Sequence, residues 1–308
     1  MFYYVFLILI YALSLLPLWV FYRISDGMFH LVYHVARYRR KLVRKNLSDS
    51  FPEKSVEEIR SIEKKYYAWF CDYIVETIKL FSVSEKEMRR RITFEGLDQM
   101  DADVRNGRCV SVYLGHYCNW EWVSSLGLFI QSNGTPTQLY HPLENPTTNR
   151  LLLYARGRFK AKSLDMWKAF PILLNWKKQG KLSITGYIAD QAPLYANMHY
   201  WPNFLHHDTP AFTGAERISR ILDTSVYYFD IIRPRRGYYT VKTVKICDKT
   251  SDFPKFGITE QYFRLLENSI KAHPEFWLWS HNRWKRTREM FNEHYPDEEE
   301  RNRIFSKL

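Results

Sequence analysis

The stretch CVSVYLGHYCNWE, residues 109–121, decides the fold and indicates where the chemistry lies. Its first six residues form a short β-rich run, which is typical of a buried strand. The run ends at Gly115 and His116, where glycine gives the backbone the freedom to turn. From Trp120 to Ile130 apolar residues then recur at helical spacing. The sequence therefore predicts a strand, a loop that carries His116, and a helix.

The same alternation of strands and helices continues on both sides of this stretch. A helix is expected over residues 56–81, because Ser55 and Glu58 can form a capping box at its start. Further helices are predicted at 84–90, 149–159, 210–221 and 260–272, a strand and turn at 92–100, and strands at 137–142, 183–188, 226–233 and 239–246, the last two as a hairpin. This order favours an α/β fold with a mixed central sheet flanked by helices. The acidic residues 296–301 are expected to form a surface tail.

The N-terminal segment predicts a membrane anchor. Residues 1–22 contain no charge and are long enough to span a bilayer as one helix. There is no basic leader and no small-residue cleavage site, so the segment is expected to be retained; a kink at Pro17 would instead give an interfacial or re-entrant insertion. The basic residues that follow place the remaining domain, 23–308, on the cytoplasmic side: Arg23, Arg37, Arg39, Arg40, Lys41, Arg44 and Lys45.

Composition and charge limit the partners. The 308 residues are 46% hydrophobic and carry a formal net charge of +12, so anionic partners are expected. Charge does not distinguish anionic lipid, a phosphorylated glycolipid, an acidic carrier protein and nucleic acid, but no nucleotide-binding glycine loop and no nucleic-acid motif are present. The cysteines have neither disulfide-framework nor zinc-like spacing, and His206-His207 lacks a third ligand at suitable spacing, so neither a metal nor a cofactor is expected: Cys71, Cys109, Cys118 and Cys247.

His116 and Glu121 suggest acid–base chemistry. Residues five apart on a helix are displaced by about 140°, so the two side chains meet only if His116 lies in the loop and Glu121 in the first helical turn. Asn119 is a plausible cap for that helix. A carboxylate on one imidazole nitrogen makes the other a general base, which can deprotonate the hydroxyl or amine of an acceptor for direct attack on a thioester.

These blocks together resemble the lipid A late acyltransferases, the lauroyl and myristoyl transferases within the wider HxxxxD/E glycerolipid and lysophospholipid acyltransferase group. The resemblance spans nearly the whole chain: the anchor, the GHxxNWE-like motif at 115–121, Asn145-Pro146 with downstream arginines, Ala189-Asp190-Gln191, and PEFWLWSHNRWKRTR at 274–288. It implies a glycerolipid acyltransferase-like fold and a catalytic dyad of His116 and Glu121. It also implies second-tier or substrate-binding roles for Asn119, Arg156, Arg158, Asp190 and Gln191.

The implied activity is transfer of a fatty acyl chain from acyl carrier protein or acyl-CoA to a membrane lipid at the bacterial inner membrane. A lipid A precursor is the first choice of acceptor; a lysophospholipid or an amino-acid lipid is the alternative. The sequence departs from the family pattern at Ala192-Pro193-Leu194-Tyr195 and in the loop 197–208, two segments that bear on acceptor and chain length. A different class of function also remains: a non-catalytic protein that holds anionic lipid on basic and aromatic patches.

Several of these residues have a plain structural interpretation as well. Arg156 and Arg158 can belong to a solvated helix face, and Asp190 can cap a turn at a strand end. Near the C-terminus a basic patch is expected at Arg283, Lys285, Arg286 and Arg288. The interleaved tryptophans are either core residues or interfacial anchors: Trp277, Trp279 and Trp284.

Overall fold

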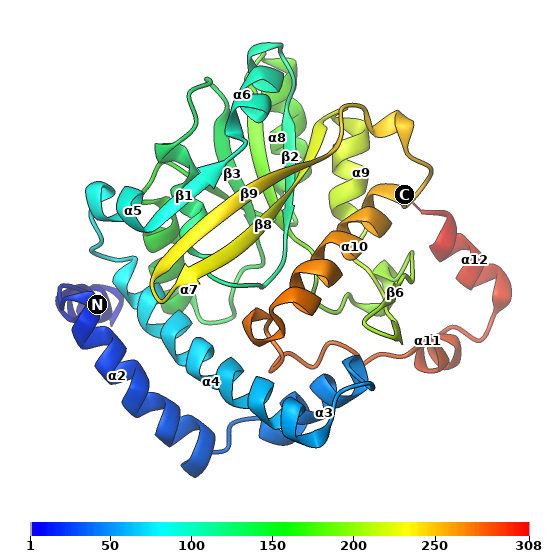
Figure 1. Cartoon of the computed structure of the whole chain (residues 1–308). Helices are drawn as coiled ribbons and strands as arrows, with labels where there is room; N and C mark the ends of the chain where they lie inside the picture. The colour runs from blue at the N-terminus through cyan, green and yellow to red at the C-terminus, as the bar shows by residue number, and fades with distance from the viewer. Residues whose placement is uncertain (1, 308) are drawn as a thin grey trace.

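A mostly parallel seven-stranded sheet forms the centre of the computed structural model, which describes residues 2–307 (Figure 1). The strand order is β1-β9-β8-β2-β5-β3-β4, and β8 and β9 are the antiparallel pair. The expected mixed α/β sheet and the hairpin are confirmed. The strands are β1 Ile92–Glu95, β2 Val110–Leu114, β3 Thr135–Tyr140, β4 Lys162–Asp165, β5 Ser183–Ile188, β8 Ser225–Arg235 and β9 Tyr238–Cys247, and a separate short pair joins β6 Asn203–Phe204 to β7 His207–Asp208.

Helices surround this sheet, and α4 is the longest of them in the described residues. The predicted capping box at its start is confirmed, because the Glu58 amide donates to Ser55 Oγ and the Ser55 amide donates to Glu58 Oε2. The α-helices are α1 Phe2–Ser14, α2 Leu18–His30, α3 Arg40–Ser50, α4 Val56–Lys79, α5 Glu85–Arg91, α6 Leu97–Arg105, α7 Pro146–Gly157, α8 Ala169–Lys178, α9 Gly214–Ile221, α10 Gly257–Ala272, α11 Arg288–His294 and α12 Glu298–Ser306.

The apolar N-terminal segment is bent and does not form the single helix expected over residues 1–22. Pro17, which lacks an amide hydrogen, stands directly before α2 and interrupts the helical hydrogen bonds. No single helix in residues 2–307 is long and apolar enough to cross a bilayer. The pair Tyr3–Ser14 and Leu18–Val35, bent by 105°, meets the length and composition of a span when taken together.

The outer surface of this bent pair is strongly apolar. Large hydrophobic side chains that elsewhere fill the core are exposed here, including Trp19 at 69% and Ile8 at 67% exposure. So many exposed large hydrophobic side chains in one segment are typical of membrane contact. The basic stretch behind it is only partly free, because Arg40 and Arg44 each lie 2.7 Å from the buried carboxylate of Glu63.

Two further predicted elements differ from the structure. The helix expected over 120–130 is a short 3₁₀ helix, Trp122–Leu128, because both the amide and the hydroxyl of Ser124 donate to the Glu121 carbonyl in the tighter i to i+3 pattern. The acidic residues 296–301 lie at the surface as predicted, but they do not form a tail. They include the start of helix α12, whose Ile304 is buried in a small second cluster with Met198, Trp201 and Phe291.

Candidate active site

Two neighbouring parallel strands bring His116 and Asp190 together. In the register of β2 and β5, Leu114 pairs with Ile188, and each polar residue follows two positions later. The His116 Nδ1 atom lies 2.7 Å from Asp190 Oδ1, and the His116 amide donates to Asp190 Oδ2 at 2.9 Å. The backbone and the ring of His116 are therefore both fixed by one carboxylate.

Asp190 is almost fully buried and remains a hydrogen-bond acceptor. Burial opposes its ionisation, but the charge and hydrogen bonds of His116 and the Trp277 indole N–H, 2.8 Å from Oδ2, outweigh burial and lower the pKa of Asp190 to about 2. An ionised carboxylate only accepts, so the proton of a neutral His116 ring sits on Nδ1. The Nε2 atom then carries the lone pair, and the Gln191 side-chain amide lies 3.2 Å from it.

Glu121 does not make the contact with the imidazole that the sequence predicted. Within residues 2–307 no hydrogen bond joins His116 to Glu121; Asp190 occupies that position. Glu121 is instead held by two hydrogen bonds from Arg156, at 2.7 and 2.6 Å. Burial would raise the pKa of Glu121, but the charge and hydrogen bonds of Arg156, with a smaller contribution from the charge of His116, lower it.

A cavity of about 590 Å³ lies beside these groups. Polar side chains meet at one part of its wall: His116, Glu121, Arg156 and Gln191. Most of the remaining wall is apolar and comes from strands β2, β3 and β5, helices α7 and α9 and the 3₁₀ helix, with Val112, Leu114, Leu126, Leu139, Leu152, Ile184 and Ile218 among its residues. A pocket of this size, apolar with a few convergent polar groups, fits a long hydrocarbon chain whose reactive end faces His116.

The remaining predicted site residues, Asn119 and Arg158, are not among the residues that line this cavity. Asn119 is fully buried, and its Oδ1 accepts from the Trp122 amide at 3.1 Å. It was predicted to cap the helix, but Glu121 is the residue directly before the 3₁₀ helix, and Asn119 instead holds the turn that leads into it. Arg158 donates to the Leu80 carbonyl just beyond the end of α4. Both arrangements support the structure around the site.

The C-terminal block is only partly at the surface: Lys285 is exposed, and Arg286 and Arg288 are partly exposed. Arg283 was expected in a basic patch but is fully buried, and it donates to the Pro210 carbonyl at 2.6 Å. Burial lowers the pKa of Arg283 to about 10. Trp277 and Trp279 are buried too, so both belong to the core and neither is an interfacial anchor.

The candidate metal ligands do not cluster. Within the described residues no group of three or more His, Cys, Asp or Glu side chains could hold a metal ion. The ring of His207 stacks on Trp284 with centroids 3.9 Å apart, while all four cysteines are buried and free. His207 therefore has a packing partner in its loop.

Two comparisons with known proteins bear on the family of the chain. The family model for the bacterial lipid A biosynthesis acyltransferases matches residues 1–286. The chain belongs to this family. It is also 24% identical, over 276 residues, to the lipid A biosynthesis lauroyltransferase of Escherichia coli K12, a match that covers 88% of this chain and 87% of the relative.

For this lipid A acyltransferase, sequence reasoning missed one member of the site and misplaced another. Trp277 was considered only as core or anchor, yet its indole N–H binds the same Asp190 oxygen as the His116 amide. Asp190 was treated as second-tier although it touches the imidazole. The available signal was the pair of adjacent parallel strands, whose carboxyl ends meet at one edge of a sheet.

Proposed function

We propose that the chain transfers a fatty acyl group from an acyl thioester to a hydroxyl of a lipid A precursor, with His116 as the general base. The observation that carries this proposal is the Nε2 atom of His116, which faces an apolar cavity while Nδ1 is bound to Asp190. The donor is acyl carrier protein or acyl-CoA. The positive net charge of the chain suits either donor, because the acidic carrier protein and the phosphates of coenzyme A are both anionic.

The reaction needs no nucleophile from the protein. The acceptor hydroxyl takes the place of the Gln191 amide at Nε2 and gives up its proton as its oxygen attacks the thioester carbonyl. The tetrahedral intermediate then collapses, the C–S bond breaks, and the departing thiolate takes the proton back from the imidazolium. The products are an ester on the acceptor and a free thiol on the donor.

Two carboxylates support the imidazolium in different ways. Asp190 holds Nδ1–H directly and fixes the tautomer and the ring orientation. Glu121 does not touch the imidazole and acts through its charge. The attraction between a charged His116 and the Glu121 carboxylate lowers the pKa of Glu121, and the same attraction stabilises the imidazolium. The ion pair with Arg156 keeps Glu121 in place at the cavity wall.

We place the bent α1–α2 pair in the bacterial inner membrane, with the α/β domain on the cytoplasmic side. The exposed apolar side chains of the pair would enter the lipid. Exposed basic residues within α2 and just after the pair, namely Arg23, Arg37 and Lys41, would meet anionic headgroups. A lipid acceptor could then reach the cavity without crossing water.

The experiment is an acyl-transfer assay with the full chain in detergent micelles. The substrates are a labelled acyl thioester and a lipid A precursor, with a lysophospholipid as the competing acceptor. We expect mass spectrometry to show one added acyl chain on the lipid A precursor and loss of one chain from the lipid A of a deletion strain. Binding of the lipid without any acylated product would instead support the non-catalytic function.

A further inference from the structure

We infer that the turn of α4 from Tyr73 to Glu76 is a positioning element. Through it, the position of the N-terminal helix α2 determines the position of the catalytic segment 119–122. The inference rests on the proposed function, because it assigns these residues a role in the geometry around His116 and Glu121. Glu76 is its centre. This buried carboxylate lies outside the cavity lining and touches no reacting group.

Tyr73 and Glu76 hold the four consecutive residues of the segment. Glu76 Oε2 accepts from Asn119 Nδ2 at 2.6 Å, and the Glu76 carbonyl accepts from the Trp122 indole at 3.1 Å. The Tyr73 ring stacks on Trp120 with centroids 4.2 Å apart, and the Tyr73 hydroxyl lies 3.5 Å from Glu121 Oε1.

The Trp120 ring then continues this contact to the catalytic histidine. Its centroid lies 5.1 Å from that of the His116 ring, edge to face. A rotation or shift of α4 by a fraction of an ångström would therefore move Glu121 directly and His116 through Trp120. Catalytic geometry is sensitive to such shifts, since a misplacement of 1 Å costs about a hundredfold in rate.

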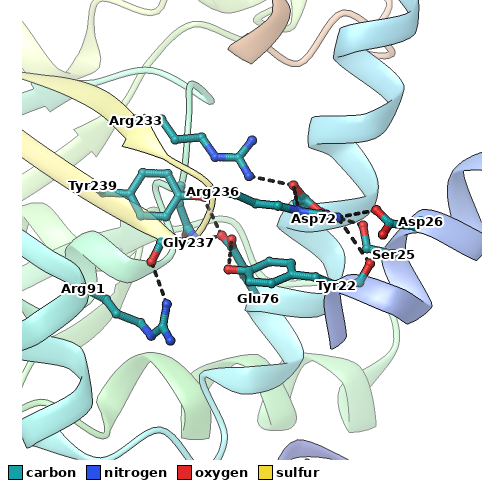
Figure 2. A network of polar contacts seen from close by, with 11 residues as sticks. Tyr22, Ser25, Asp26, Asp72, Glu76, Arg91, Arg233, Arg236, Gly237 and Tyr239 are labelled. Atoms are coloured by element: carbon teal, nitrogen blue, oxygen red, sulfur yellow. Dashed lines mark hydrogen bonds and ion pairs between the residues drawn. The ribbon is translucent and has the colours of Figure 1, made fainter. Parts of the chain in front are cut away.

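The same turn of α4 is bound on its other side by α2. The Tyr22 hydroxyl donates to Glu76 Oε1 at 2.9 Å, and the Ser25 hydroxyl donates to Asp72 Oδ1 at 2.6 Å (Figure 2). One residue joins the two groups of contacts, because the two oxygens of Glu76 divide between Tyr22 on α2 and Asn119 on the catalytic segment. A continuous path of hydrogen bonds thus runs from α2 through Glu76 to Asn119, the first residue of the catalytic segment.

The tip of the β8–β9 hairpin closes this arrangement. Arg233 and Arg236 bind Asp72, and the Tyr239 hydroxyl donates to Glu76 Oε2 at 2.6 Å (Figure 2). Gly237 has a φ of +75°, and a side chain there would overlap the Tyr22 hydroxyl. The tip of the hairpin therefore packs closely on α2. The position of α2 between the hairpin and α4 is fixed by these contacts.

Glu76 differs from an ordinary structural ion pair. Its direct partners among the described side chains are neutral: two tyrosine hydroxyls and one amide. A buried carboxylate without a directly bound cation is costly, so its stability depends on all three donors staying in place. Loss of the α2 donor is expected to loosen the other two, one of which holds Asn119.

The test is Tyr22→Phe in the full chain, which removes one hydroxyl and keeps the ring. Tyr4→Phe is the matched control, because Tyr4 lies on the same segment and is 62% exposed. We expect Tyr22→Phe to lower kcat about tenfold, the equivalent of one lost hydrogen bond to a charged group, with KM for the acyl thioester unchanged. Membrane association should equal that of the wild type. Tyr4→Phe should keep the wild-type kcat.

Glu76→Gln is the second variant, and we expect a larger loss of kcat because the new amide group faces donors on both sides. If the folded Tyr22→Phe protein keeps kcat within about twofold of the wild type, the positioning role is wrong, even if its unfolding temperature falls. A wild-type protein without turnover would instead reject the proposed function. The two failures are therefore distinguishable.

Discussion

Asp190 and Glu76 are both buried carboxylates held by three hydrogen bonds, yet their environments have opposite effects on ionisation. Asp190 is 2% exposed and binds a ring that can become charged, and its pKa is lowered to about 2. Glu76 is 0% exposed and binds neutral donors, and burial raises its pKa. Burial alone therefore does not predict the role of a carboxylate.

The difference lies in what each partner does next. The ring of His116, which Asp190 orients, lines the cavity in which the proposed proton exchange with the acceptor takes place. The partners of Glu76 end in a helix, a hairpin and a loop, and none of the three donors lines the cavity. In the proposed mechanism the first carboxylate supports the proton transfer, and in the further inference the second supports the geometry of the site.

Asp190→Asn tests the first half of this comparison and has the largest expected effect among the variants that leave His116 in place. The amide cannot hold Nδ1–H as the carboxylate does, so the tautomer and the charge stabilisation are both lost. We expect kcat to fall about a hundredfold or more, within the range of general base catalysis. Steady-state kinetics with the acyl thioester measures this. A loss below about threefold would transfer the orienting role away from Asp190.

Arg156→Met tests the second carboxylate of the site. It leaves Glu121 buried without its cation, and we expect the free energy of unfolding to fall by about 3 kcal/mol. The double variant Glu121→Gln/Arg156→Met should recover much of that stability without recovering activity. Denaturant unfolding and turnover of the three proteins measure the two quantities separately. Equal stability of the single and double variants would contradict the proposed ion-pair role.

Trp277→Phe is a smaller change to the Asp190 cluster. The ring volume is largely kept and one of three hydrogen bonds to the carboxylate is removed. We expect a loss of about 1 to 3 kcal/mol in the free energy of unfolding and a decrease in kcat smaller than that of Asp190→Asn. Thermal unfolding together with kcat measures both. A variant as inactive as Asp190→Asn would mean that Trp277 acts on the reaction more directly.

The pH dependence of stability separates the two carboxylates by sign. The lowered pKa of Asp190 means that its ionised form stabilises the fold above the unfolded-state pKa of about 4, and this stabilisation is lost as pH falls toward about 2. The raised pKa of Glu76 has the opposite effect, because ionisation costs stability as pH rises above about 4.

The wild type should therefore gain stability relative to Asp190→Asn as pH rises from 2 to 4, and lose it relative to Glu76→Gln as pH rises further. Denaturant unfolding of the three proteins across this range measures both differences. If both differences in stability changed with pH in the same direction, the opposite effects proposed for Asp190 and Glu76 would be contradicted.

Local patterns were enough to predict most of the fold. The capping box at Ser55, the β-rich run before Gly115 and the hairpin around residues 233–237 each depend on neighbours in the chain. The acidic stretch at 296–301 lies at the surface as expected, but its helix was missed because Ile304, which anchors that helix, is buried against distant residues. A kink at Pro17 was considered, but the apolar sequence around it does not predict how large the bend is.

The candidate site was only half predictable for the same reason. The motif at 115–121 identified His116 and Glu121, and both line the cavity. The partner of each came from elsewhere in the chain: Asp190 from the neighbouring strand and Arg156 from α7. Spacing within a motif identifies candidate site residues, whereas strand register and helix packing determine which side chains are in contact.

The most direct measurement is the turnover of His116→Ala in the acyl-transfer assay, with membrane association and thermal unfolding recorded on the same preparation. If the imidazole takes the acceptor proton, the variant should fold, remain at the membrane and lose acyl transfer by at least about a hundredfold. A folded, membrane-bound His116→Ala protein that acylates the lipid A precursor at nearly the wild-type rate would contradict the account.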